Sequence, residues 1–398
     1  MFKSRYFKTA LGIYISYGML GMILILLSSN MGFLMKQFNT DAAGISFLIS
    51  AEGIVRSATL YAAGRLSDKF GRKRFLCLAP LTMVVFLVGI PLSPSYGLAI
   101  LFSAFAGISH AFMDAASYPT LMECFPKTPG TANVLIKAFV ATGGALLPFI
   151  IAFFVERNMF YGNTFFLIAL IVFLNGLFIM GRKFPQQNEI SASNDKTDSN
   201  VKFSSEPVFR KEGIALIIIG FTSNSIYTAF QMWMPTFGQK ILGMNQLTSL
   251  KFITYYSIGA IVSVFILAKL LQKTIKPILV TAVYPIIGII FLIIVLIFKT
   301  TTVATISFAL AGFSSAGVLQ MAQTTMGELF WRNKGATIAL VSTASGIAAA
   351  VIPASTGLIL RHFGIVYVFY FMLGIYVIAI IASTIAKMRY DKVFGKNK

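Results

Sequence analysis

Long apolar stretches recur along the whole chain, separated by short polar connections, and twelve of them can be distinguished. A stretch of about twenty apolar residues crosses the hydrocarbon core of a bilayer as an α-helix. The pattern therefore predicts an all-α polytopic membrane protein. The expected spans are 9–29, 42–63, 74–92, 96–121, 132–155, 162–181, 213–235, 247–268, 276–298, 302–327, 335–359 and 364–387.

Residues 182–212 interrupt this pattern with a polar stretch that contains Pro, Gln, Asn, Ser and Asp. Such a composition cannot bury a core, so we expect a linker. It separates a six-helix bundle over 1–181 from a second six-helix bundle over 213–398, which ends in a short tail.

The two halves resemble each other at an offset of 205 residues. Matching glycines and prolines are informative because each marks an unusual backbone requirement. The offset indicates two parallel repeats related by an axis along the membrane normal. The matches include Ala106–Ser109 with Ala311–Ser314, Glu123 with Glu328, Gly130 with Gly335 and Pro148 with Pro353.

The charged residues are few, 12% of the chain, and their excess is strongly basic, with a net charge of +20. A basic protein can bind nucleic acid, but the positions of these charges argue against that partner. Of the 33 Lys and Arg residues, 25 fall on the side of the expected termini and five on the other side. This asymmetry predicts a multi-pass protein of the cell (inner) membrane with both termini and the linker in the cytoplasm.

The connection between the second and third spans reads Gly-Arg-Leu-Ser-Asp-Lys-Phe-Gly-Arg-Lys-Arg over residues 64–74. It resembles the loop between helices 2 and 3 of major facilitator superfamily (MFS) transporters, Gly-x-Leu-x-Asp-[Arg/Lys]-x-Gly-[Arg/Lys]-[Arg/Lys], at every fixed position. Span count, sidedness and repeat agree with this resemblance. It implies the twelve-helix MFS fold, two six-helix bundles related by a pseudo-two-fold axis, with a monomer as the default state.

The resemblance also implies that this loop belongs to a cytoplasmic gate. Asp68 is expected to cap or pair with a helix end in the second half, in the eleventh span. Glycines allow a tight turn and close helix approach. The alternative is a loop that only sets topology. The expected gate residues are Gly64, Arg65, Asp68, Gly71, Arg72, Arg74 and the acids Glu123 and Glu328, which would receive the arginines.

Glu52, Arg56, His110 and Asp114 lie inside the predicted spans, where an uncompensated charge is costly. Glu52 and Arg56 are four residues apart and share one helix face, as do His110 and Asp114. One interpretation is that Glu52 takes up a proton and frees Arg56 for an anion, while His110 and Asp114 form a proton relay. The alternatives are an intrahelical Glu52–Arg56 ion pair and a His110–Asp114 pair that only stabilises packing.

Other polar residues fall on predicted spans that line the central cavity in this fold. They could bind a polar solute from both halves, or form only hydrogen bonds between helices. The candidates are Tyr17, Tyr118, Asn224, Tyr227, Gln231, Gln320 and Gln323.

These residues favour proton-coupled transport of a small polar solute across the bilayer, in particular an organic anion. Multidrug/proton efflux is the alternative. Its usual Gly-Pro-x-x-Gly-Gly pattern is incomplete here, because residues 143–148 read Gly-Gly-Ala-Leu-Leu-Pro. A membrane sensor without transport is a further alternative. We expect no enzyme, cofactor or metal site, since the sequence has no phosphate-binding glycine loop, nucleophile constellation or metal-ligand cluster.

Overall fold

The computed structural model describes residues 5–125, 129–185, 205–270, 275–330 and 334–395 of the 398-residue chain. Within these residues twelve helical spans are long and apolar enough to cross a membrane, which confirms the predicted number. The first half contains α1 (Phe7–Ile23), α2 (Leu26–Ser29), α3 (Met31–Gln37), α4 (Ala42–Phe70), α5 (Arg72–Leu92), α6 (Tyr96–Cys124), α7 (Pro129–Glu156) and α8 (Asn163–Met180). The second half begins with a short π-helix (Phe209–Gly213) and continues with α9 (Ile214–Leu242), α10 (Gln246–Leu270), α11 (Pro277–Ile297), α12 (Thr301–Ser315), α13 (Val318–Leu329), α14 (Lys334–Phe363) and α15 (Ile365–Phe394).

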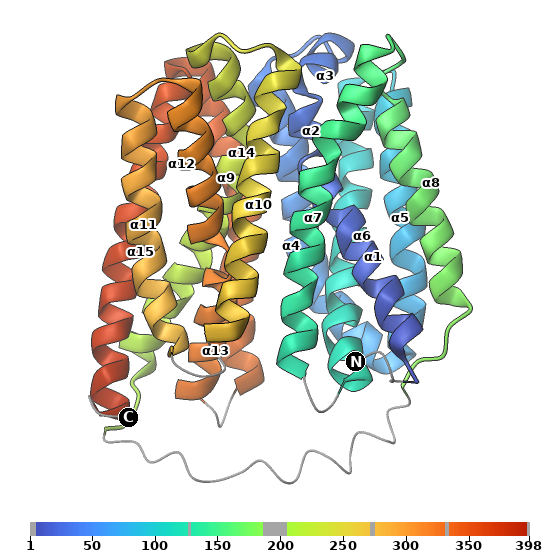
Figure 1. The fold of residues 1–398 in the computed structure, drawn as a ribbon. Coiled ribbons are helices and arrows are strands. Elements are labelled where there is room, and N and C mark those ends of the chain that lie inside the picture. Colours follow the sequence, from blue (N-terminus) through green and yellow to red (C-terminus); the bar gives the residue numbers. More distant parts are fainter. Residues whose placement is uncertain (1–4, 126–128, 186–204, 271–274, 331–333, 396–398) are drawn as a thin grey trace.

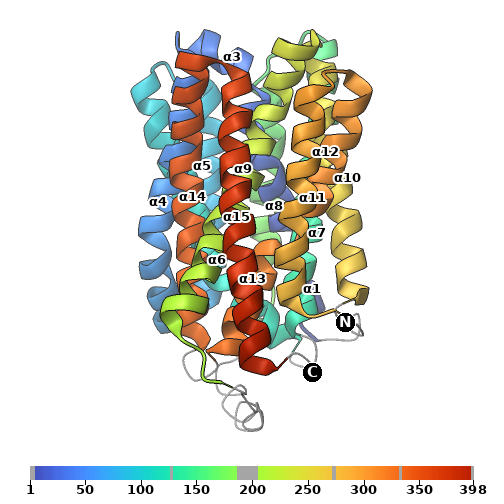
Figure 2. The same cartoon turned by 90° about the vertical axis from the view of Figure 1, so that its left-hand side faces the viewer.

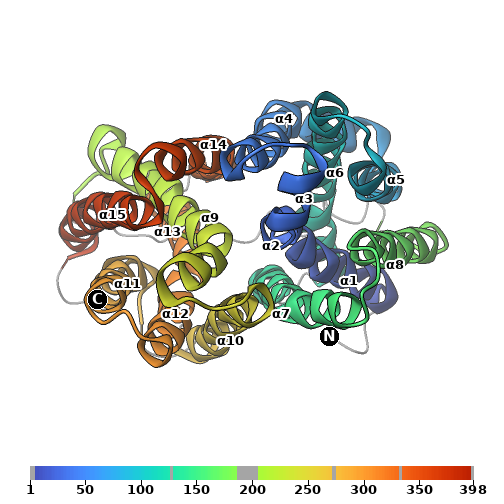
Figure 3. The ribbon, with the colours of Figure 1, turned by 90° about the horizontal axis from the view of Figure 1, so that it is seen from above.

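The helices form two groups that stand side by side, α1–α8 in one and α9–α15 in the other (Figure 1). The axes of the long helices are roughly aligned with one another in the view turned by 90° (Figure 2). The start of α1 and the end of α15 lie at the same end of the molecule (Figure 1). Seen from above, the two groups meet where α4 packs on α14 and α7 packs on α10 (Figure 3).

Small residues allow the α4–α14 contact to be close. A Cβ atom added to Gly53 would lie 2.5 Å from the backbone oxygen of Ala349 on α14. One added to Gly357 of α14 would lie 2.6 Å from the side chain of Ser46 on α4. Membrane helices associate through such small-residue contacts because lipid gives no hydrophobic force between them.

The motif over residues 64–74 is not the loop that its sequence predicts. Helix α4 continues through Gly64 to Phe70, and α5 begins at Arg72. The turn consists of Gly71 alone, with φ +92° and ψ 133°, a conformation open almost only to glycine. The expected close approach at Gly64 is also wrong for this structure, since a Cβ there would have no described atom within 4 Å.

Two spans that were expected to be continuous are interrupted. The first breaks between α1 and α2 at Leu24 and Ile25, and the tenth between α12 and α13 at Ala316 and Gly317. Gly317 is left-handed, with φ +85°, which ends α12 and restarts the chain as α13. Several other helices extend up to seven residues beyond the predicted apolar limits, as α9 does to Leu242 and α15 to Phe394, because polar residues can continue a helix into water.

Candidate functional site

A cavity of about 60 Å³ lies between the two halves. By volume it has room for roughly four water molecules. The first half contributes residues from the break between α1 and α2 and from α2, α4 and α6, and the second contributes residues from α9 and α14. Its polar lining consists of Ser28, Glu52, Arg56, His110, Tyr227, Thr228 and Gln231.

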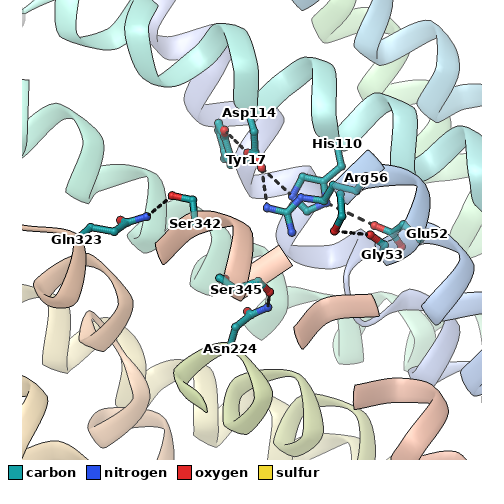
Figure 4. Close-up of polar contacts among 11 residues, drawn as sticks. Tyr17, Glu52, Gly53, Arg56, His110, Asp114, Asn224, Gln323, Ser342 and Ser345 are labelled. Atoms are coloured by element: carbon teal, nitrogen blue, oxygen red, sulfur yellow. Dashed lines mark hydrogen bonds and ion pairs between the residues drawn. The ribbon is translucent and has the colours of Figure 1, made fainter. Parts of the chain in front are cut away.

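Helices α4 and α6 bring the four ionisable residues together because they cross closely at Gly107. A Cβ on Gly107 would lie 2.4 Å from the backbone oxygen of Glu52 and 2.9 Å from the backbone nitrogen of Arg56. His110 and Asp114 follow on α6, one and two turns along the helix. The crossing therefore places their side chains against those of Glu52 and Arg56 (Figure 4).

Asp114 holds Arg56 in a short ion pair. The Nη2 atom of Arg56 donates to Oδ2 of Asp114 at 2.7 Å, and the hydroxyl of Tyr17 donates to Oδ1 at 2.8 Å (Figure 4). Tyr118 packs edge-on against Tyr17, with ring centroids 5.9 Å apart. Both carboxylate oxygens of Asp114 are thus engaged, which lowers the cost of a carboxylate at this depth.

Among the described residues, Arg56 forms its ion pair with Asp114 rather than with Glu52, so the intrahelical pair considered above is wrong. Glu52 faces His110 instead, with Oε1 3.5 Å from Nδ1. The other ring nitrogen, Nε2, lies 3.6 Å from Oδ2 of Asp114. The imidazole therefore stands between two carboxylates that belong to different helices.

Several buried polar atoms of residues that line this cavity have no hydrogen-bond partner in the part of the chain that the structure describes. They are Nε of Arg56, Nδ1 of His110 and Oε1 of Gln231. Buried polar atoms are nearly always paired, so each of these needs an explanation. A bound solute or water is the simplest partner at a cavity wall.

The remaining candidates are divided by the structure. Tyr227 and Gln231 line the cavity. Asn224 and Gln323 instead bond within the second half, from Asn224 Nδ2 to the backbone oxygen of Ser345 at 2.7 Å and from Gln323 Nε2 to Oγ of Ser342 at 2.9 Å (Figure 4). Gln320 is half-buried on α13 and does not line the cavity.

At the end of the molecule where the chain begins and ends, Arg72 forms an ion pair with Glu123, one of the two acids expected to receive an arginine. Glu328 accepts a hydrogen bond from the hydroxyl of Tyr390 at 3.1 Å. Arg65 and Arg74 are exposed. The expected contact of Asp68 with the eleventh span falls on a side chain outside those that the structure describes.

At the opposite end, Asp41 joins the two halves. Both of its oxygens accept from Arg361 of α14, from Nε at 2.5 Å and from Nη2 at 2.6 Å. Asp41 also caps α4 by accepting from the backbone N–H of Gly44 at 3.0 Å. The bonds from Arg361 lower the pKa of Asp41 to about 2. The sequence showed an acid before a helix, a capping signal, but no sign of a partner 320 residues away.

The Major Facilitator Superfamily profile matches residues 13–331. The chain is 46% identical to the "Uncharacterized MFS-type transporter YfkL" of Bacillus subtilis (strain 168), over 98% of each protein. It is 36% identical to the "Inner membrane transport protein YdiM" of Escherichia coli (strain K12), over 89% of this chain and 87% of the relative. Among solved structures it resembles a D-xylose-proton symporter in fold, with a TM-score of 0.75, 15% identity and coverage of 96% and 97%. The chain therefore belongs to the Major Facilitator Superfamily, a family of multi-pass membrane transporters and not of enzymes.

Proposed function

We propose that the chain is a proton-coupled secondary transporter that moves a small organic anion by alternating access. The observation that supports this most is the 2.7 Å ion pair between Asp114 and Arg56, a residue on the wall of the cavity between the halves. An anion that binds Arg56 must compete with this carboxylate. A proton on Asp114 removes the competing charge, so proton and anion assist each other's binding.

Glu52 and His110 supply the route for that proton in our proposal. Glu52 lines the cavity, and His110 lies 3.5 Å from Glu52 and 3.6 Å from Asp114. Imidazole exchanges protons readily near neutral pH. Glu52 accepts the proton from the cavity, and His110 passes it on to Asp114.

We further propose that residues 1–181 and 213–398 are the two units that rock about this site, joined by a cytoplasmic linker over 182–212. The 25-to-5 distribution of Lys and Arg supports cytoplasmic termini in a cell (inner) membrane. The Arg72–Glu123 ion pair joins the first residue of α5, beside the Gly71 turn, to α6. The resemblance places the gate at this turn. Asn224, Gln320 and Gln323 would reach a solute only after the second unit moves.

The cavity also bears on the choice of solute. It is small and is lined by the guanidinium-bearing Arg56, whose Nε atom has no hydrogen-bond partner among the described residues. A compact hydrophilic acid fits this wall better than the large lipophilic cations that a multidrug antiporter takes.

Purified protein in liposomes with a trapped pH indicator tests the proposal. We expect small carboxylates added outside to acidify the lumen faster than in protein-free liposomes or with the Arg56→Ala variant, because symport carries protons inward. Alkalinisation of the lumen would indicate exchange for protons instead. If no carboxylate in a panel of mono- and dicarboxylates moves protons through folded protein, proton-coupled anion transport is wrong.

A further inference from the structure

We infer that the transported acid carries a hydrogen-bond donor, a hydroxyl or an amino group close to its carboxylate, and that Gln231 recognises this donor. The inference rests on the proposed function, because it assigns the carboxylate to Arg56. It adds a second point of recognition, on the other half of the molecule.

Gln231 is placed for this role by helix α9. The residue is only 6% exposed and lines the cavity between the halves. Its Oε1 atom has no hydrogen-bond partner among the described residues. Since an amide oxygen is a strong acceptor, leaving it buried and unpaired is costly, and a donor from the solute removes that cost.

Comparison with other amide side chains of the second half argues against a packing role. Asn224 on the same helix and Gln323 on α13 both bond to α14, at 2.7 and 2.9 Å. These two amides stabilise the bundle in the ordinary way. Gln231, by contrast, lines the cavity, and its buried oxygen has no hydrogen-bond partner within the described structure.

The two walls of the cavity define the chemistry of the solute. Arg56 on the first half offers a donor with positive charge, and Gln231 on the second half offers a neutral acceptor. A plain monocarboxylate would leave the Gln231 oxygen unpaired. A dicarboxylate would place a second anion against an acceptor.

The small volume of about 60 Å³ favours a solute in which the two groups are close, as in 2-hydroxy and 2-amino acids. Such an acid contacts both halves at once and so ties its binding to their closure. An amino group would also gain an ion pair with Glu52, which a hydroxyl would not.

Binding of matched acids tests this inference. Dissociation constants of lactate, alanine and propionate are measured by calorimetry on the purified full chain. We expect lactate, alanine or both to bind at least about tenfold more tightly than propionate, because a site built around a donor rejects the analogue that lacks it. Alanine ahead of lactate assigns the amino acid class, and the reverse order assigns the hydroxy acid class.

The variant Gln231→Met keeps side-chain length and loses the acceptor. It should bind all three acids with similar affinity, and propionate about as well as the wild type does. Gln231→Asn shortens the side chain by one methylene and so moves the amide away from the solute. It should also lose the preference for lactate or alanine over propionate, and it replaces the Met variant in the test if that variant folds poorly. Gln239→Met is the matched control, because Gln239 lies on the same helix, is exposed and donates to Ser249 Oγ at 3.1 Å. It should retain the preference.

Equal binding of the three acids by the wild type, or a preference that survives in both Gln231 variants, overturns the inference while leaving the proposed function intact. Arg56→Ala separates the two ideas. If the wild type binds none of these acids, or the Arg56→Ala variant binds them equally well, carboxylate recognition at Arg56 is wrong, and the role of Gln231 fails with it.

Discussion

Asp114 is the residue on which the chemistry of this site depends. Its carboxylate accepts hydrogen bonds from Arg56 and Tyr17 and lies near Nε2 of His110. Asp114 therefore contacts one fixed positive charge, on Arg56, and two groups that can carry a proton, Tyr17 and His110. Lys137 on α7 is also close enough to interact with its charge. Because these partners come from four helices, α1, α4, α6 and α7, a change of charge on Asp114 acts on all four of them.

Replacing Asp114 with Asn tests its role in coupling. The amide keeps an acceptor for Tyr17 but cannot take up a proton, and it leaves Arg56 without its counter-ion. We expect proton-driven accumulation to fall at least about tenfold while exchange of solute across the membrane remains measurable, as for loss of one coupled step. Uptake driven by a pH gradient is compared with counterflow in the same proteoliposomes. Unchanged accumulation would remove Asp114 from the mechanism.

Replacing Arg56 with Ala tests its role in binding. A charge-assisted bond to a carboxylate is about twice as strong as a neutral one, so we expect affinity for a carboxylate to fall at least about tenfold. Affinity for the corresponding neutral amide should change little. Calorimetry on lactate and lactamide makes the comparison. Similar losses for both would reduce Arg56 to a structural partner of Asp114.

At the scale of helices, the spacing of residues along the sequence predicts which side chains share one helix face. It does not predict which other helix packs against that face. The twelve spans could be predicted because bilayer thickness sets their length. The exchange of partners among Glu52, Arg56, His110 and Asp114 could not, because it depends on the crossing of α4 and α6 at Gly107. The breaks at Ile25 and Gly317 were missed for a related reason, since apolar composition continues through both.

Gly53 offers a test of the close contact between α4 and α14. A Cβ at this position would lie 2.5 Å from the Ala349 oxygen, so Gly53→Ala should destabilise the arrangement seen here by about 1–3 kcal/mol, the usual cost of overpacking. Spin labels on α4 and α14 should report a larger distance between the halves. Gly374→Ala on α15 is the control, because a Cβ there has no described atom within 4 Å and alanine favours helix. An equal response of both variants would contradict the proposed packing constraint.

At the scale of the whole molecule, the two halves are joined asymmetrically at the end opposite the termini. The repeat relates the α4–α14 contact to that between α10 and α7, where Thr254 donates to the backbone oxygen of Ala145 at 3.1 Å. The Asp41–Arg361 ion pair has no charge-matched copy, because the related positions hold Gln246 and Glu156. At this end an ion pair thus joins α4 to α14, whereas the α7–α10 contact lacks one at the related positions. The Asp41–Arg361 pair must break before α4 and α14 can separate here.

The low pKa of Asp41 makes the Asp41–Arg361 ion pair independent of proton coupling. Since the pKa is about 2 in the pair, below the usual value of about 4, the stabilisation is fully present above pH 4 and is lost as the pH falls through 2. Asp41→Asn should therefore favour opening of this end to the same extent at pH 5 and pH 8. Both side chains are more than one-third exposed, 41% for Arg361 and 44% for Asp41, so solvent screening keeps the effect small.

Distances between spin labels at the outer ends of α4 and α14 measure the population at each pH. The exchanged pair Asp41→Arg with Arg361→Asp should restore closure, since it recreates opposite charges across the same contact. No change on removing Asp41 would show that the pair does not hold this end closed. A response to Asp41→Asn that differs between pH 5 and pH 8 would show that the proton acts at this contact as well as at Asp114. The Asp41–Arg361 pair would then not be independent of proton coupling.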